Sequence, residues 1–118
     1  MRLKTILLTA PLLALSITAC ASRGPALETL DQEALFQHGM ERLRDRDWSG
    51  AIATFERFTL TFPNHDRVPE ARFRIAEAYE GRGEHVTAAL EYNRLAGDYP
   101  AGPWADDARF GVCRSYYE

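Results

Sequence analysis

Hydrophobic residues between positions 31 and 118 recur every three or four positions, the spacing that places side chains on one face of an α-helix. The pattern is clearest in residues 71–100. One apolar face there ends at Gly81 and Gly83, and a second ends before Pro100, because glycine and proline terminate helices. The pattern predicts two short antiparallel helices joined by a tight turn. A single pair cannot bury both apolar faces, so this stretch needs helical neighbours.

The chain repeats itself at an offset of 37 residues. In the first helix of each copy, the aligned triplets are Ala34, Ala71 and Ala108, then Phe36, Phe73 and Phe110, then Gly39, Ala76 and Cys113. In the second helix, residues 48–63 align with residues 85–100, including a proline at the end of each stretch. An internal repeat of this length predicts stacked helical hairpins.

The order of small, aromatic and proline residues resembles the tetratricopeptide repeat, and the likeness is carried by Ala76, Tyr79, Ala88, Tyr92 and Pro100. We expect Ala76 and Ala88 to let the paired helices approach closely, and Tyr79 and Tyr92 to fill the groove between them. The predicted fold is all-α, a right-handed solenoid of tetratricopeptide-like helical hairpins with about two and a half repeats. The repeats are expected at about 31–66, 67–103 and, incompletely, 104–118.

The first helix is expected over residues 31–46 and the second over 48–62, with Asp47 as the N-cap of the second. The third is expected to begin near Asp66, with Pro69 in its first turn. The fifth is expected to begin near Pro103. Because the chain stops within that helix, we expect it to be the N-terminal fragment of a longer protein.

Residues 1–20 have the character of an export signal. Arg2 and Lys4 precede an apolar stretch, 6–17, that is short for a membrane-spanning helix. The segment 17–20, with the sequence ITAC, resembles a bacterial lipobox. This resemblance implies a lipoprotein signal peptide over residues 1–19 and a covalent lipid on the sulfur of Cys20.

Two fates of this N-terminal segment stay open. Ordinary secretory cleavage after Ala21 would release a soluble periplasmic protein. If Cys20 is lipidated instead, two or more acyl chains anchor the protein stably, and residues 20–30 form a linker to the repeat domain. No Asp follows Cys20, which by resemblance to lipoprotein sorting signals implies an outer-membrane protein that faces the periplasm.

Composition and motifs argue against several classes of function. The net charge is −3, and two of the basic residues lie in the first 20 positions, so we expect no nucleic-acid partner. The three histidines, the cysteines and the carboxylates form no nucleophile, metal or phosphate-loop motif. We therefore expect no enzyme activity, no metal, and no cofactor besides the lipid on Cys20. Cys113 is expected to be a small packed hydrophobic residue.

The repeat also indicates where a partner would bind. In tetratricopeptide stacks, by this resemblance, the first helix of each pair lines the concave surface. The candidate peptide- or partner-binding residues on those helices are Phe36, Met40, Phe73, Glu77, Phe110, Arg114 and Tyr117. A row of aromatic rings flanked by charges would suit an extended peptide that is rich in aromatic residues. The alternative is that the three phenylalanines pack between neighbouring first helices.

The lipobox, linker and hairpins together resemble the BamD (ComL-type) outer-membrane assembly lipoproteins, and the matching segments are 51–63, 71–79, 88–100 and 106–110. The resemblance implies a non-catalytic scaffold of the β-barrel assembly machinery. Its implied partners are the insertase BamA, other lipoproteins of that machinery and unfolded outer-membrane proteins. Two alternatives remain: a periplasmic tetratricopeptide adaptor for cell division or peptidoglycan synthesis, and an enzyme whose catalytic part lies beyond Glu118.

Overall fold

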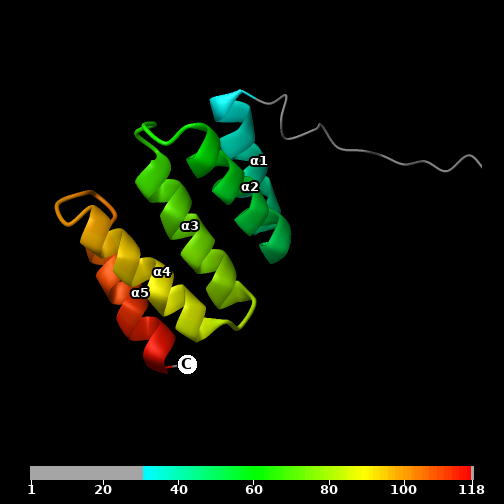
Figure 1. Ribbon diagram of the computed structural model, residues 1–118. Helices are drawn as coiled ribbons and strands as arrows, with labels where there is room; N and C mark the ends of the chain where they lie inside the picture. Colours follow the sequence, from blue (N-terminus) through cyan, green and yellow to red (C-terminus); the bar gives the residue numbers. More distant parts are fainter. Residues whose placement is uncertain (1–30, 118) are drawn as a thin grey trace, which may run out of the picture.

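A computed structural model describes residues 31–117 of the chain. These residues form five α-helices and no strand: α1 (Gln32–Arg44), α2 (Trp48–Thr61), α3 (Val68–Gly81), α4 (His85–Asp98) and α5 (Ala105–Tyr117). Each helix packs along the next in chain order (Figure 1). The prediction of an all-α fold of stacked helical hairpins is confirmed. The predicted signal peptide, Cys20 and the linker lie outside the described residues.

Aspartate side chains cap the first two helices. Asp31 accepts a hydrogen bond from the backbone N–H of Ala34 over 2.8 Å, at the start of α1. Asp47 accepts one from the N–H of Gly50 over 3.0 Å, which confirms it as the N-cap of α2. Helix α3 begins at Val68, two residues later than expected.

Helix α1 ends at Arg44, before the predicted boundary at Arg46. The backbone of Arg46 has a φ of 59°, which lies in the left-handed region and cannot continue the helix. In the second hairpin, 37 residues later, Gly83 occupies the same place with a φ of 79°. The two hairpins therefore share one turn geometry, which the first builds with arginine and the second with glycine.

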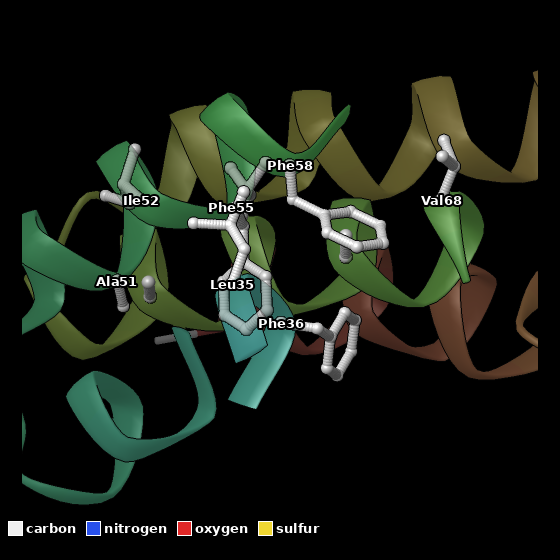
Figure 2. Packing of buried hydrophobic residues seen from close by; sticks show 10 residues of the cluster. Leu35, Phe36, Ala51, Ile52, Phe55, Phe58 and Val68 are labelled. Atoms are coloured by element: carbon white, nitrogen blue, oxygen red, sulfur yellow. The ribbon is translucent and has the colours of Figure 1, made fainter. Parts of the chain in front are cut away.

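The first core cluster joins α1, α2 and α3, and its buried residues are Leu35, Phe36, Ala51, Ile52, Phe55, Phe58, Val68, Ala71, Ile75 and Ala78. Figure 2 shows the rings of Phe36 and Phe58 side by side in this cluster, and their centroids are 5.3 Å apart. The ring of Phe55 lies against Gly39, where an added Cβ would come within 2.7 Å of a ring carbon. The close approach of α1 and α2 therefore depends on a missing side chain.

The second core cluster joins α3, α4 and α5, and its buried residues are Phe73, Ala76, Ala88, Tyr92, Leu95 and Ala108. Ala76 and Ala88 are fully buried, as expected for small residues that let paired helices approach closely. Tyr92 is also fully buried, and its ring lies against Gly111 of α5. The same device, an aromatic ring on a glycine, therefore occurs in both clusters.

The prediction for Cys113 is wrong, because its side chain is exposed. Its counterpart Ala76 belongs to the second core cluster, together with residues of α4. Helix α5 buries a different face, made of Ala105, Ala108, Gly111 and Ser115. Within the part of the chain that the structure describes, no helix covers the face of α5 that carries Cys113.

Candidate partner-binding groove

A groove of about 620 Å³ opens beside α1 and α3, a volume typical of ligand sites. Four helices contribute to its lining, which consists of Met40, Leu43, Arg44, Trp48, Arg74, Glu77, Glu80, Gly81 and Arg114. The groove therefore combines one apolar region with a charged rim.

The apolar region consists of Met40 and Leu43 of α1 and Trp48, the first residue of α2. All three are half-buried and pack against the first core cluster. The indole ring of Trp48 lies on Gly81 at the end of α3, where an added Cβ would come within 2.7 Å of the ring. Because Gly81 has no side chain, the flat ring closes the gap between the two hairpins.

The charged rim is paired within the protein. Arg74 donates a hydrogen bond to the carboxylate of Glu77 over 2.8 Å. The Nε of Arg114 donates to the carboxylate of Glu80 over 3.0 Å, and a second N–H of the same guanidinium also contacts this carboxylate. Arg44 is different, because its nearest acidic partner is Asp45 at 4.0 Å and its side chain is 76% exposed.

Glu80 also accepts hydrogen bonds from two hydroxyl groups, one on α4 and one on α5. The hydroxyl of Tyr92 donates to it over 2.9 Å, and the hydroxyl of Ser115 donates over 2.8 Å. Burial by itself would raise the pKa of Glu80, but the donors Arg114, Ser115 and Tyr92 outweigh it and hold the pKa below its ordinary value. Burial, reinforced by the Glu80 carboxylate, raises the pKa of Tyr92, so its hydroxyl stays protonated as a donor.

A chain of ion pairs extends from the groove rim toward the start of α1. Arg74 donates to Glu70 over 3.4 Å, and Glu70 accepts a second bond from Arg67 over 3.0 Å. Arg67 also donates to Glu33 of α1 over 3.2 Å. These contacts join the first helices of neighbouring hairpins.

Phe36 and Phe73 are covered by different side chains, an arginine of this chain of ion pairs and a tryptophan. The guanidinium carbon of Arg67 lies 3.4 Å from the ring centroid of Phe36, which is fully buried. The ring of Trp104, at the position equivalent to Arg67, lies 4.9 Å from that of Phe73, which is 8% exposed. Both rings therefore belong to the helix packing, and their ring partners include second helices of the hairpins: Phe36 contacts rings of α2, and Phe73 contacts a ring of α4. Phe110 differs, with 66% of its surface exposed.

The structure brings together three of the predicted partner-binding residues: Met40, Glu77 and Arg114 line the groove. Phe36 and Phe73 lie in the cores, and Phe110 and Tyr117 are exposed on α5 without lining the groove.

Sequence reasoning missed Trp48 as a lining residue. The repeat gave little indication of this role, because the equivalent position in the second hairpin is His85. It also missed Gly81, which was interpreted only as a helix end, and Glu80, whose partners Tyr92 and Arg114 are distant in sequence.

Two other kinds of site are absent from residues 31–117, the part of the chain that the structure describes. No group of three or more His, Cys, Asp or Glu side chains in that range is placed to hold a metal ion. None of the five helices is both long enough and apolar enough to cross a membrane.

Comparison with known proteins agrees with this architecture. A family model, YfiO, described as an outer membrane lipoprotein, matches residues 28–118 and so covers all five helices. A search of curated proteins gave no match. The chain therefore belongs to the YfiO family of outer membrane lipoproteins.

Proposed function

We propose that the protein is a non-catalytic scaffold of the β-barrel assembly machinery, which helps insert β-barrel proteins into the outer membrane. The observation that carries this proposal is the family match over residues 28–118, which spans the whole stack of hairpins. The stack supports a binding role because it presents a groove with an apolar region and a rim of paired charges.

The proposed attachment is a covalent lipid on Cys20, which holds the domain on the periplasmic face of the outer membrane. Two or more acyl chains suffice for stable anchoring, since each buried methylene contributes about 0.8 kcal/mol. Metabolic labelling with a palmitate analogue tests this attachment. Label is expected in the native protein and not in Cys20→Ser, whereas equal labelling of both would contradict lipidation at this residue.

The proposed partners are the insertase BamA, other lipoproteins of the machinery, and unfolded outer-membrane proteins. Met40 and Glu77 are the proposed contact residues in the groove, together with Arg114 as far as its bond to Glu80 leaves it available. The exposed Phe110 and Tyr117 of α5 are proposed as a separate contact area. Phe36 and Phe73 support binding only indirectly, because they pack the helices that carry the groove.

Site-specific photo-crosslinking in intact cell envelopes tests the assignment. The probe replaces Met40, which lines the groove, and a matched probe replaces Leu60, which is 80% exposed on α2 and does not line the groove. Capture of the barrel insertase or of unfolded barrel proteins from position 40, and not from position 60, is the expected result. Capture of only cell-division or peptidoglycan-synthesis proteins from position 40 would replace the proposal with the adaptor function.

A further inference from the structure

A second, smaller cleft lies on the other side of α3 from the groove. Helix α3 packs against both α2 and α4 (Figure 1), and residues of these three helices line the cleft. Arg74 of α3 lines the groove, whereas Arg72, two positions earlier, lines the cleft, and the same holds for Glu77 and Ile75. Two positions turn an α-helix by about 200°, so the groove and the cleft lie on opposite sides of α3.

The volume of the cleft limits what it can hold. Its lining consists of Glu56, Thr59, Arg72, Ile75, Tyr79, Glu91 and Arg94. The volume is about 200 Å³, about a third of the groove volume and below the range of about 300–1,000 Å³ that is typical of small-molecule sites. The cleft is therefore suited to the end of one side chain that projects from a protein surface, and not to a length of polypeptide.

One carboxylate in the cleft has no internal partner. Arg94 donates a hydrogen bond to Glu91 over 3.1 Å, and Arg72 donates one to Asp98 over 2.6 Å. Among residues 31–117, the carboxylate of Glu56 has neither an ion pair nor a hydrogen bond. With Asp98 included, three carboxylates and two guanidinium groups meet here. One negative charge is therefore uncompensated.

The hydroxyl of Tyr79 lies close to the negative charge of both glutamates. Burial raises the pKa of Tyr79, and the carboxylates of Glu56 and Glu91 raise it further, so the hydroxyl stays neutral. The side chain is half-buried, and its hydroxyl has no hydrogen-bond partner in the described part of the chain. Glu56 and this hydroxyl can therefore both accept hydrogen bonds from one cationic group.

The chemistry of the cleft favours a guanidinium group as that cation. A metal ion does not fit, since no group of three or more possible ligands is placed to hold one in the described helices and turns. A guanidinium carries one positive charge and a planar fork of N–H donors, which matches a carboxylate with two parallel hydrogen bonds. An ammonium group lacks this fork and is more strongly hydrated, so a lysine side chain fits less well.

We propose that the cleft between α2 and α4 binds an arginine side chain from the surface of a folded partner protein, and that Glu56 is the carboxylate that pairs with it. Tyr79 accepts a further hydrogen bond from the guanidinium. Because the cleft and the groove lie on opposite sides of α3, the protein can hold this partner and a groove ligand at the same time. The inference adds a second contact surface to the proposed scaffold and does not depend on what the groove binds.

NMR titration of the full chain in detergent tests the site directly. The probe is N-acetyl-arginine amide, and N-acetyl-glutamine amide is the uncharged comparison. The arginine amide is expected to shift the ring resonances of Tyr79 and to bind at least about tenfold more tightly than the glutamine amide. Equal binding of the two amides would overturn the proposal.

Variants separate this site from general attraction to surface carboxylates. Glu56→Gln keeps the shape of the side chain and is expected to weaken binding of the arginine amide about tenfold, and Tyr79→Phe about threefold. Glu41→Gln is the matched control, because Glu41 is 59% exposed on α1 and does not line the cleft. Equal losses in Glu56→Gln and Glu41→Gln would overturn the site. Circular dichroism confirms that each variant is folded.

Charge reversal tests the partner in intact cell envelopes. A photo-crosslinking probe replaces Thr59, which lines the cleft, and a control probe replaces Ala53, which is exposed on the same helix outside the cleft. Position 59, and not position 53, is expected to capture a protein at a segment that contains an arginine, and Glu56→Arg is expected to remove this capture. Replacing that arginine of the captured protein by glutamate is expected to restore it. If no such reversal in the segment restores capture, the pairing is wrong.

The outcomes distinguish this inference from the proposed function. If the arginine amide does not bind while position 40 still captures the insertase or barrel proteins, the cleft site is wrong and the scaffold function stands. If the arginine amide binds through Glu56 while position 40 captures only cell-division or peptidoglycan-synthesis proteins, the cleft site stands and the proposed function is wrong.

Discussion

The hydroxyl of Tyr92 on α4 donates a hydrogen bond to the carboxylate of Glu80 on α3 over 2.9 Å. The same carboxylate accepts hydrogen bonds from Arg114 and Ser115 on α5. One glutamate therefore joins three consecutive helices, at the place where the second core cluster meets the groove.

Removing this acceptor is expected to destabilise the protein. Glu80→Ala leaves the buried hydroxyl of Tyr92 and the guanidinium of Arg114 without their partner, at a cost of about 2 kcal/mol in the free energy of unfolding. Tyr92→Phe removes one donor and is expected to cost about 1 kcal/mol. Urea denaturation of both single variants and the double variant measures the effect, and fully additive losses would contradict a shared hydrogen bond.

The same carboxylate predicts acid sensitivity. The pKa of Glu80 in the folded protein lies below its ordinary value of 4.5, so the unfolded chain takes up this proton first as the pH falls. The stabilisation from Glu80 is complete above pH 4.5 and is lost as the pH falls through the folded pKa. The stability difference between the native protein and Glu80→Gln is therefore expected to shrink between pH 7 and pH 3. A difference that stays constant over that range would contradict the shift.

Two glycines are expected to tolerate no side chain. An added Cβ at Gly39 or Gly111 would lie 2.7 Å from the ring of Phe55 or Tyr92, and both rings are fully buried. Gly39→Ala and Gly111→Ala are each expected to lower the free energy of unfolding by about 1–2 kcal/mol, despite the better helix propensity of alanine. Gly97 in α4 has no neighbour within 4 Å, so Gly97→Ala is the control and is expected to stabilise by about 0.5 kcal/mol. Equal effects at all three sites would contradict the packing argument.

The turns at Arg46 and Gly83 share one backbone geometry. Replacing Arg46 by glycine and Gly83 by arginine is therefore expected to change the stability in opposite directions. Arg46 and Gly83 both have positive φ, and the surroundings of Gly83 are open. Arg46→Gly is expected to stabilise by about 0.5–1 kcal/mol and Gly83→Arg to destabilise by about 1 kcal/mol, because only glycine adopts this backbone conformation without strain. Thermal denaturation measures both changes in stability. If Arg46→Gly lowers the stability, the Arg46 side chain stabilises the fold by more than its strained backbone conformation destabilises it.

The three repeated phenylalanines are expected to differ in their contribution to stability. Phe36→Ala removes a fully buried ring and is expected to cost about 3–5 kcal/mol. Phe110→Ala changes a side chain that is 66% exposed and is expected to cost less than about 0.5 kcal/mol in the isolated chain. Denaturant titration of the two variants gives both values. Similar losses would show that Phe110 is buried in solution, against the structure.

The sequence by itself determined the helices and their pairing. Apolar spacing, capping aspartates, glycines and prolines act within a few residues, so the hairpins and the N-cap at Asp47 were predictable. The order of small and aromatic residues predicted that Ala76, Ala88 and Tyr92 would be buried, because small residues let paired helices approach closely and aromatic rings fill the space between them.

Only the tertiary structure decided what each repeated position faces. Phe36, Phe73 and Phe110 are equivalent in sequence, yet two are buried and one is exposed, because burial depends on which helix lies alongside. The groove also depends on which helices lie alongside one another. Trp48 contacts Gly81, and Arg114 contacts Glu80, and each pair is more than 30 positions apart in the chain. Such contacts join side chains from different helices, and their distances follow from helix packing, which local sequence patterns do not encode.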